Sequence, residues 1–414
     1  MTSPTDCHVS GRAAFILGLE ENGYGTLRSL ADAKVPIVGI YDSPVQSGRF
    51  SKYCEALYLD PSLTEARMCQ TLIDWRMKLV DNPVLFATSD RFALLLARQR
   101  EKLSPHFAFH WVQPEVLSRI IDKARMSQLC QEAGILSPRT HITQAGEDLT
   151  QSVRDFPFPC LIKPVRSFET GFPHEKNFLA DSPRALLEFY NSYPGMQGLT
   201  IWQEIIEGED DEVFQCTTLI RESGETGPLF VIRKIHQYPP GFGSMCFGRS
   251  EENKCVADNA VSLLHFLDYR GFASLEFKRR TRDGRYYFIE MNPRLPWYNA
   301  LFKDAAVNFP FFAYLDLSHI VGFEQVNKQQ KNGVYWISLE RDLKWFVRTR
   351  KARRNNLFRW LQSAVKARSF AWWCWRDPKP FLHSAFYLLG RGLRKTIGFF
   401  VSREIKEVEP VARS

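Results

Sequence analysis

The sequence predicts two architectures in series: an open parallel α/β domain, then an α+β module. Three observations support this division. An apolar run at Ala13–Leu19, a loop with glycines, a helix-like stretch and a second apolar run at Pro36–Tyr41 form a β-loop-α-β beginning. Strand patterns dominate from Val213 onward. Two of the later strands are joined by the turn sequence Arg282-Asp283-Gly284, which predicts a β-hairpin.

The α/β alternation continues through the first quarter of the chain. Short apolar runs at Ala56–Leu59 and Val84–Ala87 flank a helical pattern at Thr64–Lys78, and this alternation implies a parallel sheet. The glycines of Glu20–Gly25 resemble a dinucleotide-binding loop only loosely, so we interpret them as structural. Thr88-Ser89-Asp90 follows the last of these strands, at the sheet end where ligands of open α/β sheets bind.

The pattern changes after Pro114. A helix is predicted around Ser118–Glu132, with Gly134 as its C-cap. The elements that follow mix helices and strands without regular alternation, which is typical of an α+β module. They are strands at Pro159–Lys163, Thr200–Ile206, Val213–Ile220 and Leu229–Tyr238, and helices at Pro183–Tyr190 and Asn253–Leu267.

Composition narrows the class of protein. The 414 residues are 44% hydrophobic and 24% charged, which is normal for a globular fold. The nine cysteines are scattered and never spaced as C-x-x-C, which argues against a zinc site or a disulfide framework. The first 12 residues contain no apolar signal segment, and no run of about 18 apolar residues occurs. We therefore expect a cytoplasmic protein.

The C-terminal region has a different surface from the rest. Arg341–Ser414 carries 18 Lys and Arg against 5 Asp and Glu, and five of the ten tryptophans. A basic aromatic segment of this kind can lie in a membrane interface, or its aromatics can pack on the main body while the cations are solvated. We favour packing, because Pro378 and Pro380 interrupt any long amphipathic helix there.

The hairpin carries the strongest chemical signal. If its turn closes through a three-residue loop, Glu276 lies directly opposite Glu290, and Asn292 projects from the same face. Carboxylates roughly 5 Å apart repel by about 3 kcal/mol at an effective dielectric near 20, so we expect a positive charge between them. Glu, Glu and Asn oxygens suit Mg²⁺ or Mn²⁺, often together with substrate phosphate. The alternative is an ordinary amphipathic hairpin whose acids face water.

Basic residues upstream fit the same chemistry. Lys163 lies on a buried-looking strand, where an unpaired lysine is rare, so we expect it to face a polyanion. Lys123 opens the helix after Asp122 and is either a second such charge or a solvated helix lysine. Arg233, Lys234 and His236 place cations on another strand. Together with the carboxylate hairpin, these cations predict a phosphoryl-transfer site.

The ordered motifs resemble the ATP-grasp superfamily, and within it the uncharacterised carboxylate-amine ligase-like enzymes. The resemblance spans about residues 13–320. Its motifs are Lys123, Pro-Cys-Leu-Ile-Lys163-Pro, Gln203-Glu204-Ile205-Ile206-x-Gly208, Lys234-x-x-Gln-x-Pro-Pro-x-x-Gly243, Glu276-Phe277-Lys278 and Glu290-Met291-Asn292-Pro293-Arg294.

The resemblance implies an ATP-grasp architecture with an N-terminal open parallel α/β (pre-ATP-grasp) domain. The implied division is a flexible N-terminus at 1–12, the pre-ATP-grasp domain at 13–115, a two-lobed ATP-grasp domain at 116–325 with its hinge near 204–208, and a basic aromatic extension at 326–414.

The resemblance also implies roles for single residues. Lys123 and Lys163 would contact nucleotide phosphates, and Lys234 would meet phosphate as well. The adenine would lie against the hinge, and Glu212 would accept hydrogen bonds from the ribose. Arg294 would hold the transferred phosphoryl group or the acyl phosphate. The implied hinge contacts are Glu204, Ile205, Ile206 and Glu207, and the implied metal ligands are Glu276, Glu290 and Asn292.

The resulting functional hypothesis is an ATP- and Mg²⁺-dependent (or Mn²⁺-dependent) ligase. It would join a small-molecule carboxylate to an amine through an acyl phosphate, without a nucleic acid partner. Association into a homodimer is left undecided by the sequence. The rival hypothesis is a catalytically silent ATP-binding module or a membrane-surface scaffold that works through the C-terminal extension.

Overall fold

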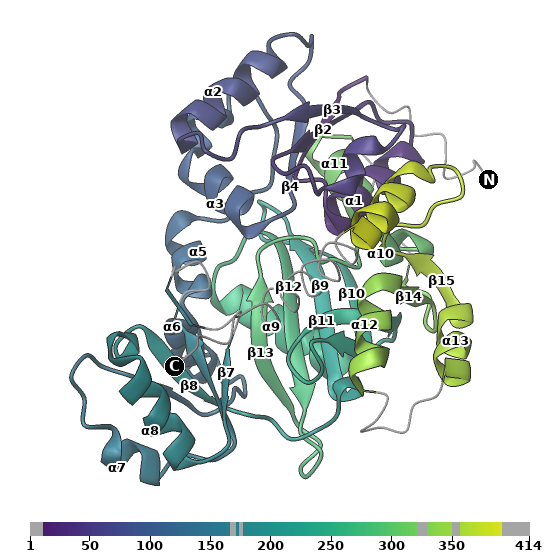
Figure 1. The fold of residues 1–414 in the computed structure, drawn as a ribbon. Helices are drawn as coiled ribbons and strands as arrows, with labels where there is room; N and C mark the ends of the chain where they lie inside the picture. The colour runs from purple at the N-terminus through teal and green to yellow at the C-terminus, as the bar shows by residue number, and fades with distance from the viewer. Residues whose placement is uncertain (1–10, 166–170, 174–176, 321–328, 350–356, 391–414) are drawn as a thin grey trace, which may run out of the picture.

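The computed structural model describes residues 11–165, 171–173, 177–320, 329–349 and 357–390 (Figure 1). Most of the expected flexible N-terminus, residues 1–10, lies outside the described residues. The described chain forms a parallel four-stranded sheet, an antiparallel four-stranded sheet and a seven-stranded sheet. The expected combination of an α/β domain with an α+β module is therefore confirmed.

The N-terminal sheet is parallel throughout, as the alternation predicts. Its strand order is β3-β2-β1-β4. The chain adds β2 and β3 on one side of β1 and then β4 on the other side, so the connections that leave β1 and β4 diverge at the edge where these two strands end. The strands are β1 (Ala14–Leu17), β2 (Ile37–Tyr41), β3 (Glu55–Tyr58) and β4 (Val84–Ala87), and the helices are α1 (Glu21–Ala31), α2 (Glu65–Arg76), α3 (Asp90–Arg98) and α4 (Arg100–Leu103).

The smaller antiparallel sheet forms a separate lobe in Figure 1. Its order is β5-β8-β6-β7. Its strands are β5 (Thr140–Ile142), β6 (Cys160–Pro164), β7 (Phe178–Ala180) and β8 (Thr200–Glu204). The helices of this part of the chain are α5 (Pro114–Ile121), α6 (Lys123–Glu132), α7 (Leu149–Arg154) and α8 (Pro183–Ser192).

The helix expected around Ser118–Glu132 is in fact two helices, α5 and α6. Asp122 separates them because its backbone is extended and its carboxylate accepts from the Arg125 amide at 2.9 Å. An Asp at an N-cap satisfies a helix-terminal N–H that otherwise has no partner, so it begins a new helix. This break makes Lys123 the first residue of α6.

The large sheet has the order β13-β12-β9-β10-β11-β14-β15 and holds the predicted hairpin at one edge. The strands are β9 (Val213–Ile220), β10 (Thr226–Tyr238), β11 (Ser244–Ser250), β12 (Gly271–Arg279), β13 (Tyr286–Asn292), β14 (Tyr335–Ile337) and β15 (Ala367–Phe370). The helices are α9 (Lys254–Phe266), α10 (Ala300–Asp304), α11 (Phe309–Leu317), α12 (Leu339–Thr349) and α13 (Leu357–Lys366).

The hairpin pairs Glu276 with Glu290, as expected, but reaches this register by a different route. The expected three-residue loop is wrong: the Arg280 amide donates to the Arg285 carbonyl at 2.9 Å, so four residues form the loop. A β-bulge then places Ile289 as an extra residue between the Phe277–Phe288 and Glu276–Glu290 pairs. Because a bulge adds one residue to one strand, it offsets the one-residue difference in the loop.

The C-terminal extension is part of the fold. It contributes β15, the strand at the far edge of the large sheet. Trp372 stacks on Tyr24 with ring centroids 5.7 Å apart, and the Arg28 guanidinium donates to the carbonyls of Phe370 (2.8 Å) and Trp373 (3.1 Å). The predicted packing is therefore confirmed for Trp372, whereas Trp375 is 83% exposed, against the prediction. No helix within the described residues has the length and apolarity needed to cross a membrane.

Asp377 fixes the extension to the N-terminal domain. Its side chain is buried, and its carboxylate accepts from the Ser51 hydroxyl at 2.5 Å, the Tyr24 hydroxyl at 3.2 Å and the Lys52 amide at 3.2 Å. Hydrogen bonds to an ionised acceptor are about twice as strong as neutral ones. This carboxylate therefore joins segments that are more than 300 positions apart in the sequence.

We predict that Asp377→Ala lowers the free energy of unfolding by about 3 kcal/mol, because it leaves the buried Ser51 hydroxyl and the Lys52 amide without their acceptor. Urea unfolding measures the change. Asp258→Ala is the matched control, since Asp258 is solvent-exposed and paired only with Lys254 in the same helix. It should cost less than about 0.5 kcal/mol. Equal, small effects of both substitutions would show that Asp377 does not anchor the extension.

Candidate active site

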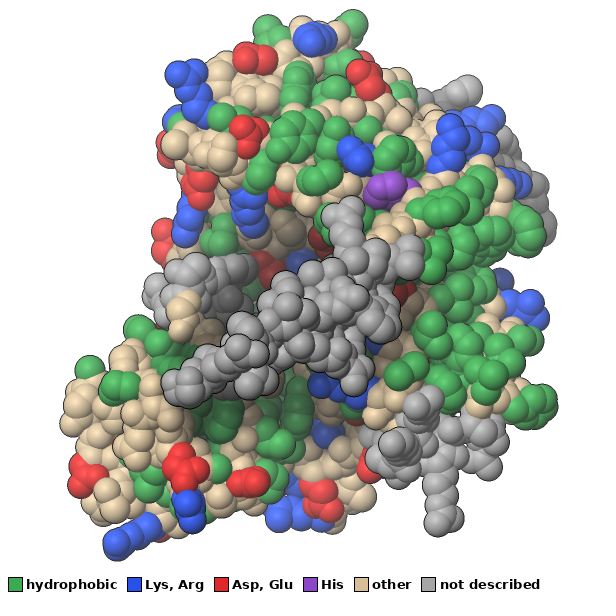
Figure 2. All heavy atoms as spheres, viewed as in Figure 1, with side chains coloured by type: hydrophobic (Ala, Val, Ile, Leu, Met, Phe, Trp, Pro, Cys, Tyr) green, Lys and Arg blue, Asp and Glu red, His purple; other side chains and the backbone are tan. Residues whose placement is uncertain are grey.

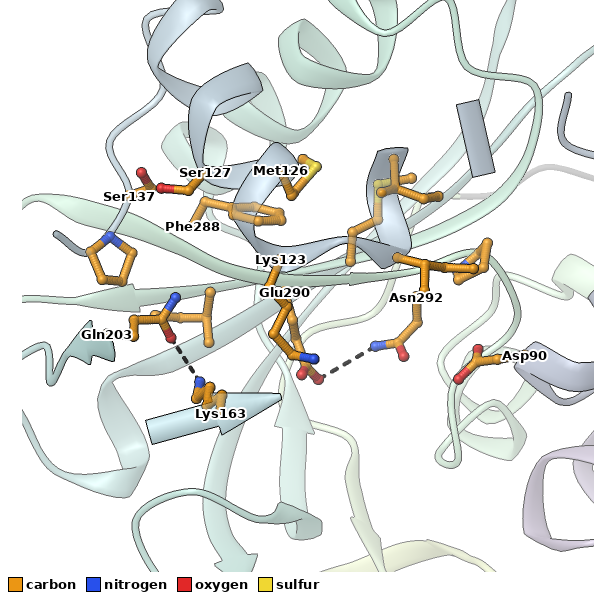
Figure 3. A pocket seen from close by; sticks show the side chains of 16 residues that line it. Asp90, Lys123, Met126, Ser127, Ser137, Lys163, Gln203, Phe288, Glu290 and Asn292 are labelled. Atoms are coloured by element: carbon orange, nitrogen blue, oxygen red, sulfur yellow. Dashed lines mark hydrogen bonds between the residues drawn. The ribbon is translucent and has the colours of Figure 1, made fainter. Parts of the chain in front are cut away.

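A pocket lies between the small lobe and the hairpin edge of the large sheet (Figure 3). It encloses about 790 Å³, part of it open to solvent. Apolar side chains, among them Met126, Phe288 and Met291, line part of its wall. Its charged and amide side chains are Asp90, Lys123, Lys163, Gln203, Glu290 and Asn292. Apolar walls combined with convergent polar groups are typical of a small-molecule site.

Two lysines enter this pocket from the small lobe. Lys163 is the fourth residue of β6, and its Nζ donates to Oε1 of Gln203 on the neighbouring strand β8 at 2.7 Å. Lys123 begins α6, and its Nζ donates to the Pro164 carbonyl at 3.1 Å. Figure 3 shows the Lys123 ammonium group beside Glu290 and the Lys163 ammonium group directed toward Gln203. The structure thus brings these two sequence-predicted cations together.

The facing carboxylates lie in unequal environments. Glu276 is buried, whereas Glu290 is exposed at the pocket. The Nζ of Lys234, which is also buried, lies 2.6 Å from Oε2 of Glu276 and donates to the Gly243 carbonyl at 3.4 Å. Burial raises the pKa of Glu276, the Lys234 charge opposes this, and the Glu290 charge adds to it. The expected positive charge beside the carboxylates is therefore partly supplied by Lys234.

The expected metal ligands share one face of the hairpin. Asn292 is opposite Ser274, two positions beyond the Glu276–Glu290 pair, and its amide lies 3.5 Å from Oε1 of Glu290. Two carboxylates and one amide oxygen form a hard-oxygen donor set that fits Mg²⁺ or Mn²⁺. Glu276 is desolvated and faces a second carboxylate, so binding of a cation beside it would also be favourable. Over the described ranges, no cluster of three or more His, Cys, Asp and Glu side chains forms a metal site.

Arg294 connects the pocket to the N-terminal domain. Its Nε donates to Oδ1 of Asp90 at 2.8 Å, and its Nη2 lies 3.4 Å from Oδ1 of Asn292. Asp90 is the first residue of α3 and follows β4, the strand placed on the other side of β1 from β2 and β3. The guanidinium therefore lies between the hairpin and the ligand-binding end of that sheet.

The expected hinge joins β8 to the large sheet and is held by arginines of the hairpin. Glu204 accepts from Arg280 at 2.7 Å and from the Arg139 amide at 3.1 Å. Glu212 accepts from Arg279 through both oxygens, at 2.6 and 2.8 Å, and these bonds lower the pKa of Glu212. The Thr281 amide donates to the Glu207 carbonyl at 3.2 Å. Ile206 is buried and Ile205 is partly buried.

Three further residues of this region had no predicted role, although Asp90 was expected at the ligand-binding end of the parallel sheet. Asp90 and Gln203 line the pocket and hold Arg294 and Lys163, respectively. Lys278 is buried, and its burial lowers its pKa, while Asp210, Glu209 and Glu276 oppose that shift. Strand alternation places Lys278 on the same face as Glu276, so the position of Lys278 near the carboxylates could have been predicted from the sequence.

His236 is held by the C-terminal extension. Its Nδ1 lies 2.7 Å from Oδ1 of Asp342, which is fully buried in α12 and also accepts from the Trp360 indole at 2.8 Å. The imidazole stacks on Trp345 with ring centroids 3.4 Å apart. The extension thus orients a side chain two residues away from Lys234.

The chain is similar to a family of ATP-binding domains and to a known ligase. Residues 247–306 match the family described as carbamoyl-phosphate synthase L chain, ATP binding domain. The chain is 24% identical over 301 residues to a D-aspartate ligase of Enterococcus faecium, covering 67% of this chain and 70% of that protein.

Solved structures with the same fold include an L-amino acid ligase from Bacillus licheniformis (TM-score 0.60, 13% identity, 78% of each chain). Another is a biotin carboxylase from Campylobacter jejuni (TM-score 0.61, 14% identity, 78% of this chain and 74% of that one). At such identities the structural likeness concerns the fold. The chain has the ATP-grasp fold, as its motifs predicted.

Proposed function

We propose that this protein is an ATP- and Mg²⁺-dependent carboxylate-amine ligase that forms an amide through an acyl phosphate. The observation that carries the proposal is the pocket in which Lys123 and Lys163 of one lobe face Glu290 and Asn292 of the other. Cations opposite hard-oxygen ligands are what a metal-bound polyphosphate requires. The similarity to a D-aspartate ligase supports the same reaction class.

The proposed reaction has two balanced steps. A carboxylate oxygen of the acid attacks the γ-phosphorus of ATP, and the bond from that phosphorus to the bridging oxygen breaks, releasing ADP. The amine nitrogen then attacks the acyl carbon, phosphate leaves with the oxygen that came from the carboxylate, and the nitrogen loses a proton. Neither step needs a nucleophilic side chain, because positioning and charge stabilisation supply the catalysis.

Each side chain has a defined task in this proposal. Lys123 and Lys163 bind phosphate oxygens, and Arg294 holds the transferred phosphoryl group beside Asp90. Lys234 neutralises Glu276 and would meet phosphate when the nucleotide is bound. Glu276, Glu290 and Asn292 would hold Mg²⁺ or Mn²⁺, which when bound neutralises charge on the phosphates.

The hinge supplies the nucleoside contacts in the same proposal. Backbone groups of 204–207 contact adenine, and Glu212 accepts from a ribose hydroxyl. Both Glu212 oxygens already accept from Arg279, but each carboxylate oxygen has a second lone pair. Arg279 therefore orients the carboxylate and leaves it able to accept again.

An ADP-release assay over paired acids and amines tests the proposal. Amino acids are the first substrates to try, because the relatives are named as D-aspartate and L-amino acid ligases. We expect ADP release that requires Mg²⁺, an acid and an amine together, with equimolar amide formed. ATP binding without turnover over the whole library would instead favour a silent ATP-binding module.

We predict that Glu290→Ala lowers Mg²⁺-dependent ADP production about 100-fold or more while the protein stays folded. Loss of this exposed carboxylate removes a metal ligand and also relieves its repulsion of Glu276. The assay is ADP release, with thermal unfolding to confirm folding. Glu222→Ala is the control, since Glu222 is exposed on a distant turn. Activity equal to wild type in Glu290→Ala would refute the metal assignment.

We predict that Lys163→Met weakens Mg-ATP binding about 10- to 100-fold, because a charge-assisted contact to phosphate is lost from a partly desolvated strand. Isothermal titration calorimetry measures the affinity. Lys254→Met is the matched control, because the Lys254 side chain is almost fully exposed and lies on α9. If both variants bind Mg-ATP as wild type does, Lys163 serves only to bind Gln203.

A further inference from the structure

The outer face of the C-terminal extension exposes large apolar side chains at helical spacing. Leu343 and Val347 are four residues apart on α12. A second stripe lies on α13, and a third lies on the helix that begins at Lys379. The side chains on these two stripes are Leu357 (57% exposed), Phe358 (67%), Leu361 (46%) and Val365 (78%), then Leu382 (46%), Phe386 (69%) and Leu389 (64%).

The exposure is concentrated on this one region. Among the described residues, 23 large apolar side chains are exposed, and 11 of them lie between Leu343 and Leu389. Trp375, which connects the stripes in sequence, is 83% exposed. Figure 2 shows hydrophobic side chains gathered along the right-hand side of the molecule, where Figure 1 places α13 and the last helix. A contiguous patch of this kind marks an interaction site more often than scattered exposed residues do.

The charges around these stripes are mostly positive, and Glu340 at the start of α12 is a partly exposed acid beside them. In the described residues from Arg341 to Gly390, the acids are Asp342 and Asp377, and both are buried. The exposed charged side chains of the same segments are Lys344, Arg348, Lys366, Arg368, Arg376 and Lys379. Lys344 is paired with Glu340, which leaves the other five as the cationic rim of the apolar face.

The two prolines support this face instead of interrupting it. Pro378 and Pro380 were expected to interrupt any long amphipathic helix, and this expectation is wrong for the helix that begins at Lys379. In the structure they lie at the beginning of the last helix, and the Leu382 amide donates to the Pro378 carbonyl at 3.0 Å. Proline is favoured in the first turn of a helix, where its missing N–H costs nothing. An amphipathic helix therefore follows them.

We propose that this face docks on the surface of an anionic phospholipid bilayer. Apolar side chains at helical spacing with a rim of Lys and Arg are the features of helices that lie in the membrane interface. The buried side of the extension is held by Asp377, Arg28 and Trp372, so the opposite side is presented as a fixed surface. Bilayer contact adds a location to the enzyme and does not depend on the proposed reaction.

Charge complementarity selects the bilayer over the other occupants. A second copy of this chain that docks through the same face would place the cationic rim against itself. The last 24 residues of the sequence carry six Lys and Arg against three Glu, so they too are net positive. Anionic headgroups complement the rim, and each Lys or Arg near such a surface raises the partition coefficient about fivefold.

Cosedimentation of the full-length protein with phosphatidylglycerol-containing vesicles tests this proposal. We expect pelleting that falls severalfold on pure phosphatidylcholine vesicles and in about 0.5 M salt, where screening shortens the range of the charges. Lys366→Gln with Arg368→Gln should lower partitioning about 25-fold. Phe358→Ser with Val365→Ser should lower it at least as strongly, because both apolar side chains are lost from the buried side of the contact.

Matched controls separate docking from general stickiness. Met77→Ser with Val80→Ser removes two side chains that are 62% and 96% exposed in the N-terminal domain, and it should leave pelleting unchanged. Because all substituted side chains are exposed, thermal unfolding should match wild type in every variant. No pelleting of the wild type, salt-independent pelleting, or equal loss in the N-terminal control would overturn the proposal. A concentration-dependent dimer abolished by Phe358→Ser with Val365→Ser would overturn it as well and assign the face to a second copy.

Discussion

The opposed carboxylates of Glu276 and Glu290 are the constraint on which the rest of the site depends. Glu276 is buried, which raises its pKa, and the facing charge of Glu290 raises it further. Lys234, two strands away in the sheet order, supplies one compensating charge at 2.6 Å. The strands β10, β9, β12 and β13 must therefore be in register before these charges can balance. A one-residue slip of β13 would turn Glu290 to the opposite face of the sheet.

The other parts of the molecule converge on the same hairpin. The small lobe brings Lys163 and Lys123 to the pocket, and the N-terminal domain contributes Asp90, which holds Arg294 at 2.8 Å. The extension reaches the other side of β10, where Asp342 orients His236. The three sheets thus each contribute to the charges around the hairpin, and the extension fixes the neighbouring part of β10 through Asp342. The C-terminal segment is built into the large sheet through β14 and β15.

Much of the fold follows from local patterns. The strands of the parallel sheet, the helix α9 and the pairing of Glu276 with Glu290 were all predicted, because buried runs and a face-to-face register have strong periodic signals. Lys123 was expected to open a helix after Asp122, but the separate helix α5 before Asp122 was missed, because helical periodicity continues across an N-cap. The four-residue loop and the bulge at Ile289 were both missed. Each shifts the pairing of the two strands by one residue, and the two shifts cancel, so Glu276 still pairs with Glu290. Partners such as Asp90 for Arg294 are 204 positions apart, and a single sequence contains no signal for that distance.

The central claim is that the site phosphorylates a carboxylate and that an amine then displaces the phosphate. The most direct measurement uses an accepted acid whose carboxylate oxygens are labelled with oxygen-18, followed by mass spectrometry of the released phosphate. An acyl phosphate breaks between its acyl carbon and the bridging oxygen, so one labelled oxygen should appear in each phosphate released. Phosphate without label, with both labelled oxygens retained outside it, would contradict the account.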